Sequence, residues 1–353
     1  MRCLFKSIFI IISVQFILTI PWVYAQDTQT KSTDNSKPNV ELKLPDQIDE
    51  NEETEDGGKQ NDVKAGKSQK FIKKSRKHSK KKGKVKRKGK RKGTRKGKRV
   101  YPLNRPKRAL KSPPPLGKIP FALGERLTYK INLMNAHSGD VVLKVGKRGV
   151  YKGTKVIELS GNIKSSPFIE NFYPIRDRLV VLVDEKTFLP VKSDFYLNEK
   201  KRESSFHTEF NTKTGHLKWQ KKSKGKNKSS KKNYQGPGKL YESLSSLYAL
   251  RRLELKVGLH FEQYVWSGRR ERLVDVKVIG EERVLTDLGW FDTYKVEISS
   301  IITGGFVTKR SLKRKAMKGT AWIAKDKFLT PIKLITPTKL GEAEAILTRR
   351  DKN

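Results

Sequence analysis

Hydrophobic and polar residues alternate in many short segments between about residue 120 and residue 350. In segment 127–133, for example, every second residue is Leu, Tyr or Ile, and the residues between them are polar. This two-residue period is typical of a β-strand with one buried face. Further strands are expected at 141–145, 156–159, 179–183, 188–191, 206–210, 215–219, 261–265, 273–279, 293–298, 319–324, 331–335 and 343–347. The pattern predicts an all-β, mainly antiparallel domain, built as a curved sheet or half-open barrel.

One segment, at about 240–252, has the period of a helix instead. Its i, i+4, i+7, i+8 spacing places five residues on one face: Leu240, Leu244, Leu247, Tyr248 and Arg251. We therefore expect one helix inside a single domain that spans 120–350. Arg251 at its end either pairs with a buried carboxylate or clamps an anionic headgroup. Tyr248 beside it is the second candidate for ligand binding.

The first 25 residues have the pattern of a signal peptide. Arg2 and Lys6 precede an uncharged apolar run over 8–20, and Val23 and Ala25 provide the small residues of a cleavage site. The alternative is an uncleaved membrane anchor, but the run is shorter than the roughly 20 residues that span a bilayer. Cys3, the single cysteine, lies before the run, so lipidation is not expected and cleavage removes it. We therefore predict export, with no transmembrane segment after cleavage.

The net charge of +43 is very unevenly distributed. The chain has 79 Lys and Arg against 36 Asp and Glu, and 25 of the basic residues lie in segment 64–111, which has no acid. The segment before it, 26–63, is acidic. Neither holds enough hydrophobic residues to bury a core, so both are predicted to be disordered. Prolines at 113–115 then predict an extended linker over 112–119, ahead of the domain.

The basic segment resembles nucleic-acid-binding tails in composition, but its context favours another partner. Export would carry it away from nucleic acid, and between 71 and 101 it has no aromatic residue on which bases could stack. An anionic envelope polymer or lipid surface is the expected partner, with the segment as an electrostatic tether. Two alternatives stay open: the basic segment is a solvated spacer, or the acidic segment screens its charge. The candidate polyanion-binding residues are Lys80, Lys81, Lys82, Lys86, Arg87, Lys88, Lys90, Arg91, Lys92, Arg95, Lys96, Lys98 and Arg99.

An ordered series of landmarks in the second half of the domain resembles a known family. The series runs through 244–251 (LSSLYALR), 255–258 (LKVG), 276–284 (VKVIGEERV), 286–293 (TDLGWFDT), 319–326 (GTAWIAKD), 328–332 (FLTPI) and 339–341 (KLG), and 124–129 and 138–139 fit the opening. The chain is similar to the family called domain of unknown function 3108, over about 120–350. The resemblance implies an exported, mainly β domain of Gram-negative envelopes, curved around a helix. It implies no catalytic residues.

The remaining chemistry in the sequence is sparse. The domain has four histidines, of which only His207 and His216 are close enough to face each other across two strands, and no HExxH or Gly-x-Ser-x-Gly motif. We therefore expect no metal, no cofactor and no catalytic residues. Asp177, between two arginines, is expected in a surface or structural ion pair, and 289–291 in a turn with buried aromatics. The basic segments 221–232 and 309–318 are expected in exposed hairpins.

These observations favour a non-enzymatic periplasmic or envelope-associated protein that binds an amphipathic or anionic envelope ligand. One alternative is a scaffold that docks another envelope protein without a small ligand. A hydrolase acting on a wall polymer has less support, because no acid, base or nucleophile stands out. A hydrophobic cavity would favour the first class, and carboxylates converging in a cleft would favour the third.

Overall fold

The computed structural model describes residues 104–200, 202–223, 228–338 and 341–351. The predicted signal peptide, the acidic segment and the basic segment as far as residue 103, including all thirteen candidate polyanion-binding residues, lie outside the described residues.

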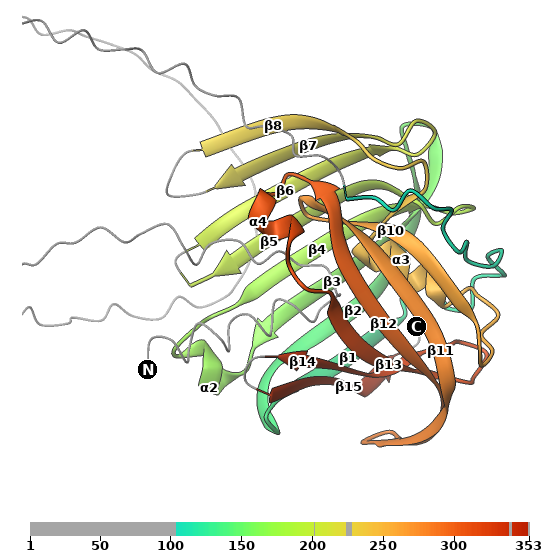
Figure 1. Ribbon diagram of the computed structural model, residues 1–353. Coiled ribbons are helices and arrows are strands. Elements are labelled where there is room, and N and C mark those ends of the chain that lie inside the picture. Colours follow the sequence, from blue (N-terminus) through green and yellow to red (C-terminus); the bar gives the residue numbers. More distant parts are fainter. Residues whose placement is uncertain (1–103, 201, 224–227, 339–340, 352–353) are drawn as a thin grey trace, which may run out of the picture. The chain divides into compact units, whose positions relative to one another are not determined.

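Fifteen strands form one sheet in the described part of the chain, which confirms the predicted fold class (Figure 1). The order across it is β8-β7-β6-β5-β4-β3-β2-β1-β15-β14-β13-β12-β11-β10-β9. The strands are β1 (Arg126–Leu133), β2 (Ala136–Tyr151), β3 (Thr154–Ser165), β4 (Arg176–Asp184), β5 (Pro190–Glu199), β6 (Arg202–Asn211), β7 (His216–Ser223), β8 (Lys228–Gln235), β9 (Leu240–Glu242), β10 (His260–Ser267), β11 (Arg270–Thr286), β12 (Gly289–Gly305), β13 (Met317–Ala324), β14 (Pro331–Thr338) and β15 (Gly341–Asp351). All neighbours are antiparallel except β9 and β10.

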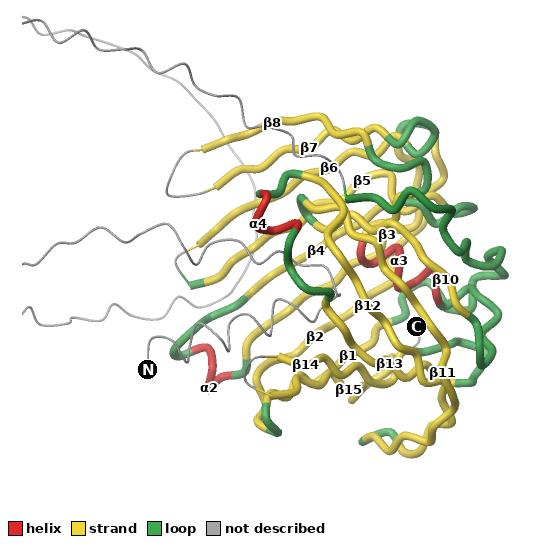
Figure 2. Tube along the Cα trace, viewed as in Figure 1, coloured by secondary structure: helices red, strands yellow, loops and turns green. Residues whose placement is uncertain are grey.

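The connection between the two edge strands explains why the sheet curls. β8 ends at Gln235 and β9 begins at Leu240, so a short link joins opposite edges of the sheet. The edges must therefore lie near each other. Side chains fill the seam between them: the rings of Tyr234 and Trp266 lie 5.3 Å apart, and the Trp219 indole donates a 2.5 Å hydrogen bond to the carbonyl of Gly268. The ladder itself does not close, so the fold is a half-open barrel (Figure 2).

The predicted helix is present but shorter than expected. Residues 240–242 form β9, and α3 (Ser243–Leu250) starts after them. Glu242 ends the strand and caps the helix: its carboxylate accepts the Leu244 N–H at 2.9 Å, and its own N–H donates to the Ser245 hydroxyl at 2.7 Å. The helix packs inside the curved sheet, against β3, β4 and β10 (Figure 1). The described residues also contain two single-turn helices, α2 (Pro167–Glu170) and α4 (Lys309–Leu312).

The basic segment 221–232 lies in a hairpin, as the sequence predicts, but most of its described part is paired strand and not loop. It supplies the end of β7 and the start of β8, and only its tip, 224–227, lies outside the described residues. The two strands pair from His216 opposite Gln235 to Ser223 opposite Lys228. Buried Leu217, together with the aromatic residues of the seam, anchors the hairpin. Lysine side chains lie over the aromatic rings, with Lys232 Nζ 5.1 Å from the centre of Phe306.

Residues 104–119, here called the strap, contact the domain. They have no regular secondary structure, but backbone hydrogen bonds hold them at three places. Asn104 N–H donates to Thr303 at 2.8 Å, Glu262 N–H to Lys111 at 2.7 Å, and Gly117 N–H to Arg252 at 2.7 Å. The sequence places 104–111 in the uniform basic segment, yet Arg105 and Arg108 form ion pairs with buried Glu271 and Glu262. Because the whole segment is basic, its sequence does not indicate which of its arginines pair with buried carboxylates.

Among the described residues, the buried carboxyl groups of Asp177 and Glu242 form no ion pair. Asp177 is buried and accepts the Asn198 N–H at 2.8 Å, so the predicted ion pair with its neighbouring arginines, surface or structural, is wrong. Alternation within β4 turns Asp177 inward and Arg176 and Arg178 outward. Burial raises the pKa of Asp177 to about 7, and it does the same to the pKa of Glu242.

The replacement Glu242→Gln is expected to flatten the dependence of stability on pH. A carboxyl whose pKa is higher in the folded than in the unfolded chain stabilises most below its unfolded pKa. That stability is lost as the pH rises through about 7. Relative to Glu242→Gln, the wild-type protein is expected to lose about 1 kcal/mol of unfolding free energy between pH 6 and pH 7. Urea unfolding at both pH values measures this. Exposed Glu254→Gln is the control, and parallel curves for wild type and Glu242→Gln contradict the expectation.

Candidate functional site

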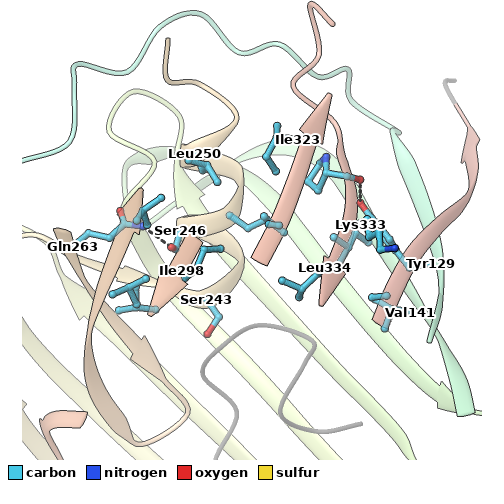
Figure 3. Close-up of a pocket in the computed structure, with 18 of the residues that line it drawn as sticks. Tyr129, Val141, Ser243, Ser246, Leu250, Gln263, Ile298, Ile323, Lys333 and Leu334 are labelled. Carbon is cyan, nitrogen blue, oxygen red and sulfur yellow. Dashed lines mark hydrogen bonds between the residues drawn. The ribbon is translucent and has the colours of Figure 1, made fainter. Parts of the chain in front are cut away.

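An apolar cavity of about 130 Å³ lies between α3 and the inner face of the sheet (Figure 3). Strands from both halves of the chain contribute to its wall, and so does one face of the helix. The lining residues are Tyr129, Ile131, Val141, Leu143, Ser243, Ser246, Leu247, Leu250, Gln263, Val265, Val274, Val276, Ile298, Ala321, Ile323, Pro331, Lys333, Leu334 and Ala345. Several of these, including Leu247, Ile298 and Leu334, are only partly buried, so the cavity is not sealed.

The few polar groups in the wall already have partners in the protein. Gln263 Nε2 donates to Ser246 Oγ at 2.7 Å, and the Tyr129 hydroxyl donates to the Pro331 carbonyl at 2.9 Å. Lys333 pairs with Glu344 at 2.6 Å. The surface left to a ligand is therefore apolar. An engineered apolar cavity of about 150 Å³ binds benzene, so this cavity has room for a ring or a segment of one hydrocarbon chain.

Arg251 and Tyr248, the two candidate ligand-binding residues, lie on the other side of α3 and do not line the cavity. The Arg251 guanidinium donates to the Glu125 carboxylate at 2.5 and 3.0 Å and also to the Phe328 carbonyl. Both side chains of this pair are buried. The guanidinium carbon lies 4.8 Å from the ring centre of Phe121 and 5.1 Å from that of Tyr248. Of its two expected roles, the geometry gives Arg251 the pairing with a buried carboxylate.

The family model for a protein of unknown function, DUF3108, matches residues 126–348. The chain belongs to the DUF3108 family. This match runs from the first residue of β1 into β15, and it confirms the resemblance carried by the landmark series.

Three solved structures resemble the DUF3108 domain at low identity. A Bacteroides fragilis protein described as exported, with a YmcC-like fold, is 10% identical over 69% of this chain and 100% of its own, with a TM-score of 0.31. A β-barrel-like DUF1849 protein from Brucella abortus is 10% identical over 65% and 98%, with a TM-score of 0.42. A protein from Parabacteroides distasonis described as a lipoprotein is 8% identical over 67% and 99%, with a TM-score of 0.31. Comparison with curated proteins gives no match.

The histidines of the DUF3108 domain are not brought together. His207 bonds to Asp194 at 2.7 Å, His216 lies 3.3 Å from Gln235, and the two do not face each other because His207 is opposite Gln220. In the residues that the structure describes, no group of three or more His, Cys, Asp and Glu is placed to hold a metal. Within the same residues, no helix has the length and apolarity needed to cross a membrane.

A second, open hollow of about 650 Å³ does hold several carboxylates, at the far end of β11 and β12. Each is paired with a base: Glu281 with Lys325, Glu282 with Lys295, Asp292 with Arg283, and Asp326 with Arg350. A hydrolase of glycosidic bonds needs one carboxyl with a raised pKa. The hydrogen bond from Lys295 instead lowers the pKa of Glu282. The predicted buried turn at 289–291 is wrong for Trp290, which is 57% exposed and lies under Arg283.

Two arginines at the start of β11 were not among the site residues predicted from the sequence. Arg270 and Arg272 are both buried, on the same face of the strand as the cavity residues Val274 and Val276. Arg314, from the basic segment 309–318, lies near enough that its charge lowers the pKa of both, after the larger effect of burial. That segment lies in the connection between the antiparallel strands β12 and β13, as α4, the loop after it and the first residues of β13. The sequence does carry a signal for these two arginines: they occupy alternate positions of an apolar strand, in phase with the residues that face inward.

Proposed function

We propose that this DUF3108 protein is exported to the cell envelope and holds the hydrocarbon part of an amphipathic envelope molecule, without catalysing a reaction. The observation that carries the proposal is the apolar cavity beneath α3, whose polar wall groups already have partners in the protein. Such a surface attracts hydrocarbon and offers no group to attack a substrate. Support for export comes from the signal-peptide pattern of residues 1–25.

The size of the cavity limits the ligand. About 130 Å³ holds a short stretch of one chain, not the two chains of a membrane lipid. The partly buried residues at its opening leave room for the rest of such a molecule to extend outward. In this proposal residues 64–99 of the basic segment hold the protein at an anionic envelope surface. Each basic residue that approaches the surface contributes up to about 1 kcal/mol of binding free energy.

Filling the cavity is expected to abolish binding of a single-chain amphiphile. Ile298 lines the cavity and Ile301 lies on the opposite face of the same strand, 40% exposed. Ile298→Trp should remove the binding of decanol that calorimetry detects with the wild-type protein, and Ile301→Trp should leave it unchanged. Solvent extraction and mass spectrometry of protein purified from envelopes should show the same difference in co-purifying molecules. Deletion of 64–99 should leave decanol binding intact but lower the salt that releases the protein from anionic vesicles.

Wild-type protein that binds no decanol and carries no hydrocarbon-chain molecule from the envelope would contradict the proposal. Equal decanol binding by Ile298→Trp and Ile301→Trp would place the binding site elsewhere, and would contradict it as well.

A further inference from the structure

Arg272 is a charged residue in an unusual place. It lies on β11, its side chain is 2% exposed, and its face of the strand is the inner face of the sheet. Directly opposite it on β10 is Val265, and two residues along its own strand is Val274; both line the cavity. Residues two apart on a strand are separated by about 7 Å. Arg272 is therefore next to two residues of the cavity wall, although it is not itself part of that wall.

The contacts of Arg272 do not neutralise its charge. Nε donates to the Ser300 hydroxyl at 3.1 Å, one Nη to the Ser300 carbonyl at 3.5 Å, and the same Nη approaches Met317 Sδ at 2.8 Å. None of the carboxylates that the structure describes forms an ion pair with it. A buried charge without a counter-charge is costly, so proteins usually pair such a group or present it to a ligand.

The surroundings of Arg272 add positive charge rather than negative. Arg270 precedes it on the same inner face, and Arg314 lies on the loop that leads into β13. Arg314 is exposed, whereas Arg270 and Arg272 are buried, so the basic groups extend from the surface inward. The buried hydroxyl of Ser267, opposite Arg270 on β10, has no hydrogen-bond partner among the described residues. It could donate to a bound oxygen.

The Met317 thioether contacts the Arg272 guanidinium where a stronger acceptor could bind. A thioether sulfur is a weak acceptor, and a methionine side chain changes rotamer easily. Met317 is only partly buried, at the first residue of β13. An anionic oxygen that displaced it would gain a charge-assisted hydrogen bond in a poorly solvated site, which is among the stronger polar contacts in proteins.

We propose that Arg272, assisted by Arg314 at the surface, binds the acidic headgroup of a single-chain amphiphile whose hydrocarbon chain lies in the cavity. This inference rests on the proposed function and specifies its ligand class: an anionic single-chain amphiphile, with a carboxylate or a phosphate monoester as the acid. The apolar wall selects the chain, and the guanidinium selects the charge.

Calorimetry with three probes of equal chain length tests the headgroup: decanol, decanoate and decyl phosphate. Wild-type protein should bind the two anions at least tenfold more tightly than decanol. Arg272→Met should lose this preference, because it removes the charge-assisted hydrogen bond to the anion, and should bind decanol within about twofold of wild type. Decanoate and decyl phosphate distinguish a carboxylate from a phosphate ligand.

Further variants distinguish an effect of the lost charge on binding from an effect on stability. Arg272→Lys should retain part of the preference for anions, since it keeps the charge but loses the two-pronged geometry. Arg283→Met, an exposed arginine on the same strand, should leave all three affinities unchanged. Without ligand, Arg272→Met should unfold at the same temperature as wild type or a higher one, because it removes a buried unpaired charge.

The outcomes distinguish this inference from the proposed function. If decanol binds and Ile298→Trp abolishes it, but Arg272→Met binds decanoate as tightly as wild type, the cavity holds a chain and the headgroup assignment is wrong. If no probe binds the wild-type protein, both fail.

Discussion

Replacing Arg251 with methionine is expected to lower the free energy of unfolding by about 3 kcal/mol, because it leaves Glu125 buried without its main partner. The Glu125 side chain is 1% exposed and receives two hydrogen bonds from the guanidinium. Arg350 is the next nearest base, but at 3.5 Å it does not replace that geometry. The pair joins the segment before β1 to the end of α3, so its loss separates the helix from the sheet.

Urea unfolding of three variants measures this effect. Arg349→Met removes an exposed arginine on β15 and should cost less than about 1 kcal/mol, as surface pairs usually do. The double variant Glu125→Leu with Arg251→Met should be more stable than Arg251→Met alone, because it removes the stranded carboxylate together with its partner. A loss below 1 kcal/mol for Arg251→Met, or a double variant less stable than the single one, would contradict the role assigned to the pair.

The strands could be predicted because most of them have one buried face. The alternation of 127–133 is seen directly in β1, where Leu127, Tyr129, Ile131 and Leu133 are all buried. Prediction failed where composition outweighed pattern. In 221–232 the lysines indicate the loop of a hairpin, although 221–223 pair with 228–230 as strand. The start of α3 failed for another reason: Leu240 fits both a helix face and a strand, and the cap at Glu242 decides between them.

From the sequence, only the class of the ligand could be predicted, not the residues that form the site. Its wall combines β1 and β2 with β10 to β15 and α3, and no sequence pattern says which strands meet across a cavity. The helical period identified the face with Tyr248 and Arg251, but that face packs against Phe121 and Glu125. The cavity lies against Ser243, Ser246, Leu247 and Leu250, so of the predicted face only Leu247 lines it. Arg272 was missed because its burial depends on pairing with Val265 and Ile302, which are distant along the chain.

The replacement Arg105→Gln is expected to destabilise the seam of the half-barrel. The Arg105 guanidinium forms an ion pair with Glu271, whose side chain is 0% exposed, and also donates to the Gln235 carbonyl at 3.1 Å. Tyr234 of β8 and Thr303 of β12 donate to the same carboxylate at 3.0 and 2.9 Å. One buried carboxylate therefore links the strap, the β8 edge and the opposite arm of the sheet. Its only ion pair among the described residues is with Arg105.

Because Tyr234 and Thr303 still donate to Glu271 in this variant, the expected loss is about 2 kcal/mol of unfolding free energy, less than for a fully stranded charge. Lys107→Gln provides a matched control: it removes the same charge two residues away, from an exposed side chain that forms no ion pair among the described residues. Hydrogen exchange should locate the effect, with faster exchange in β8 and at the start of β11 in Arg105→Gln alone. If Lys107→Gln and Arg105→Gln behave alike, the strap acts only through its total charge, and the seam does not depend on Arg105.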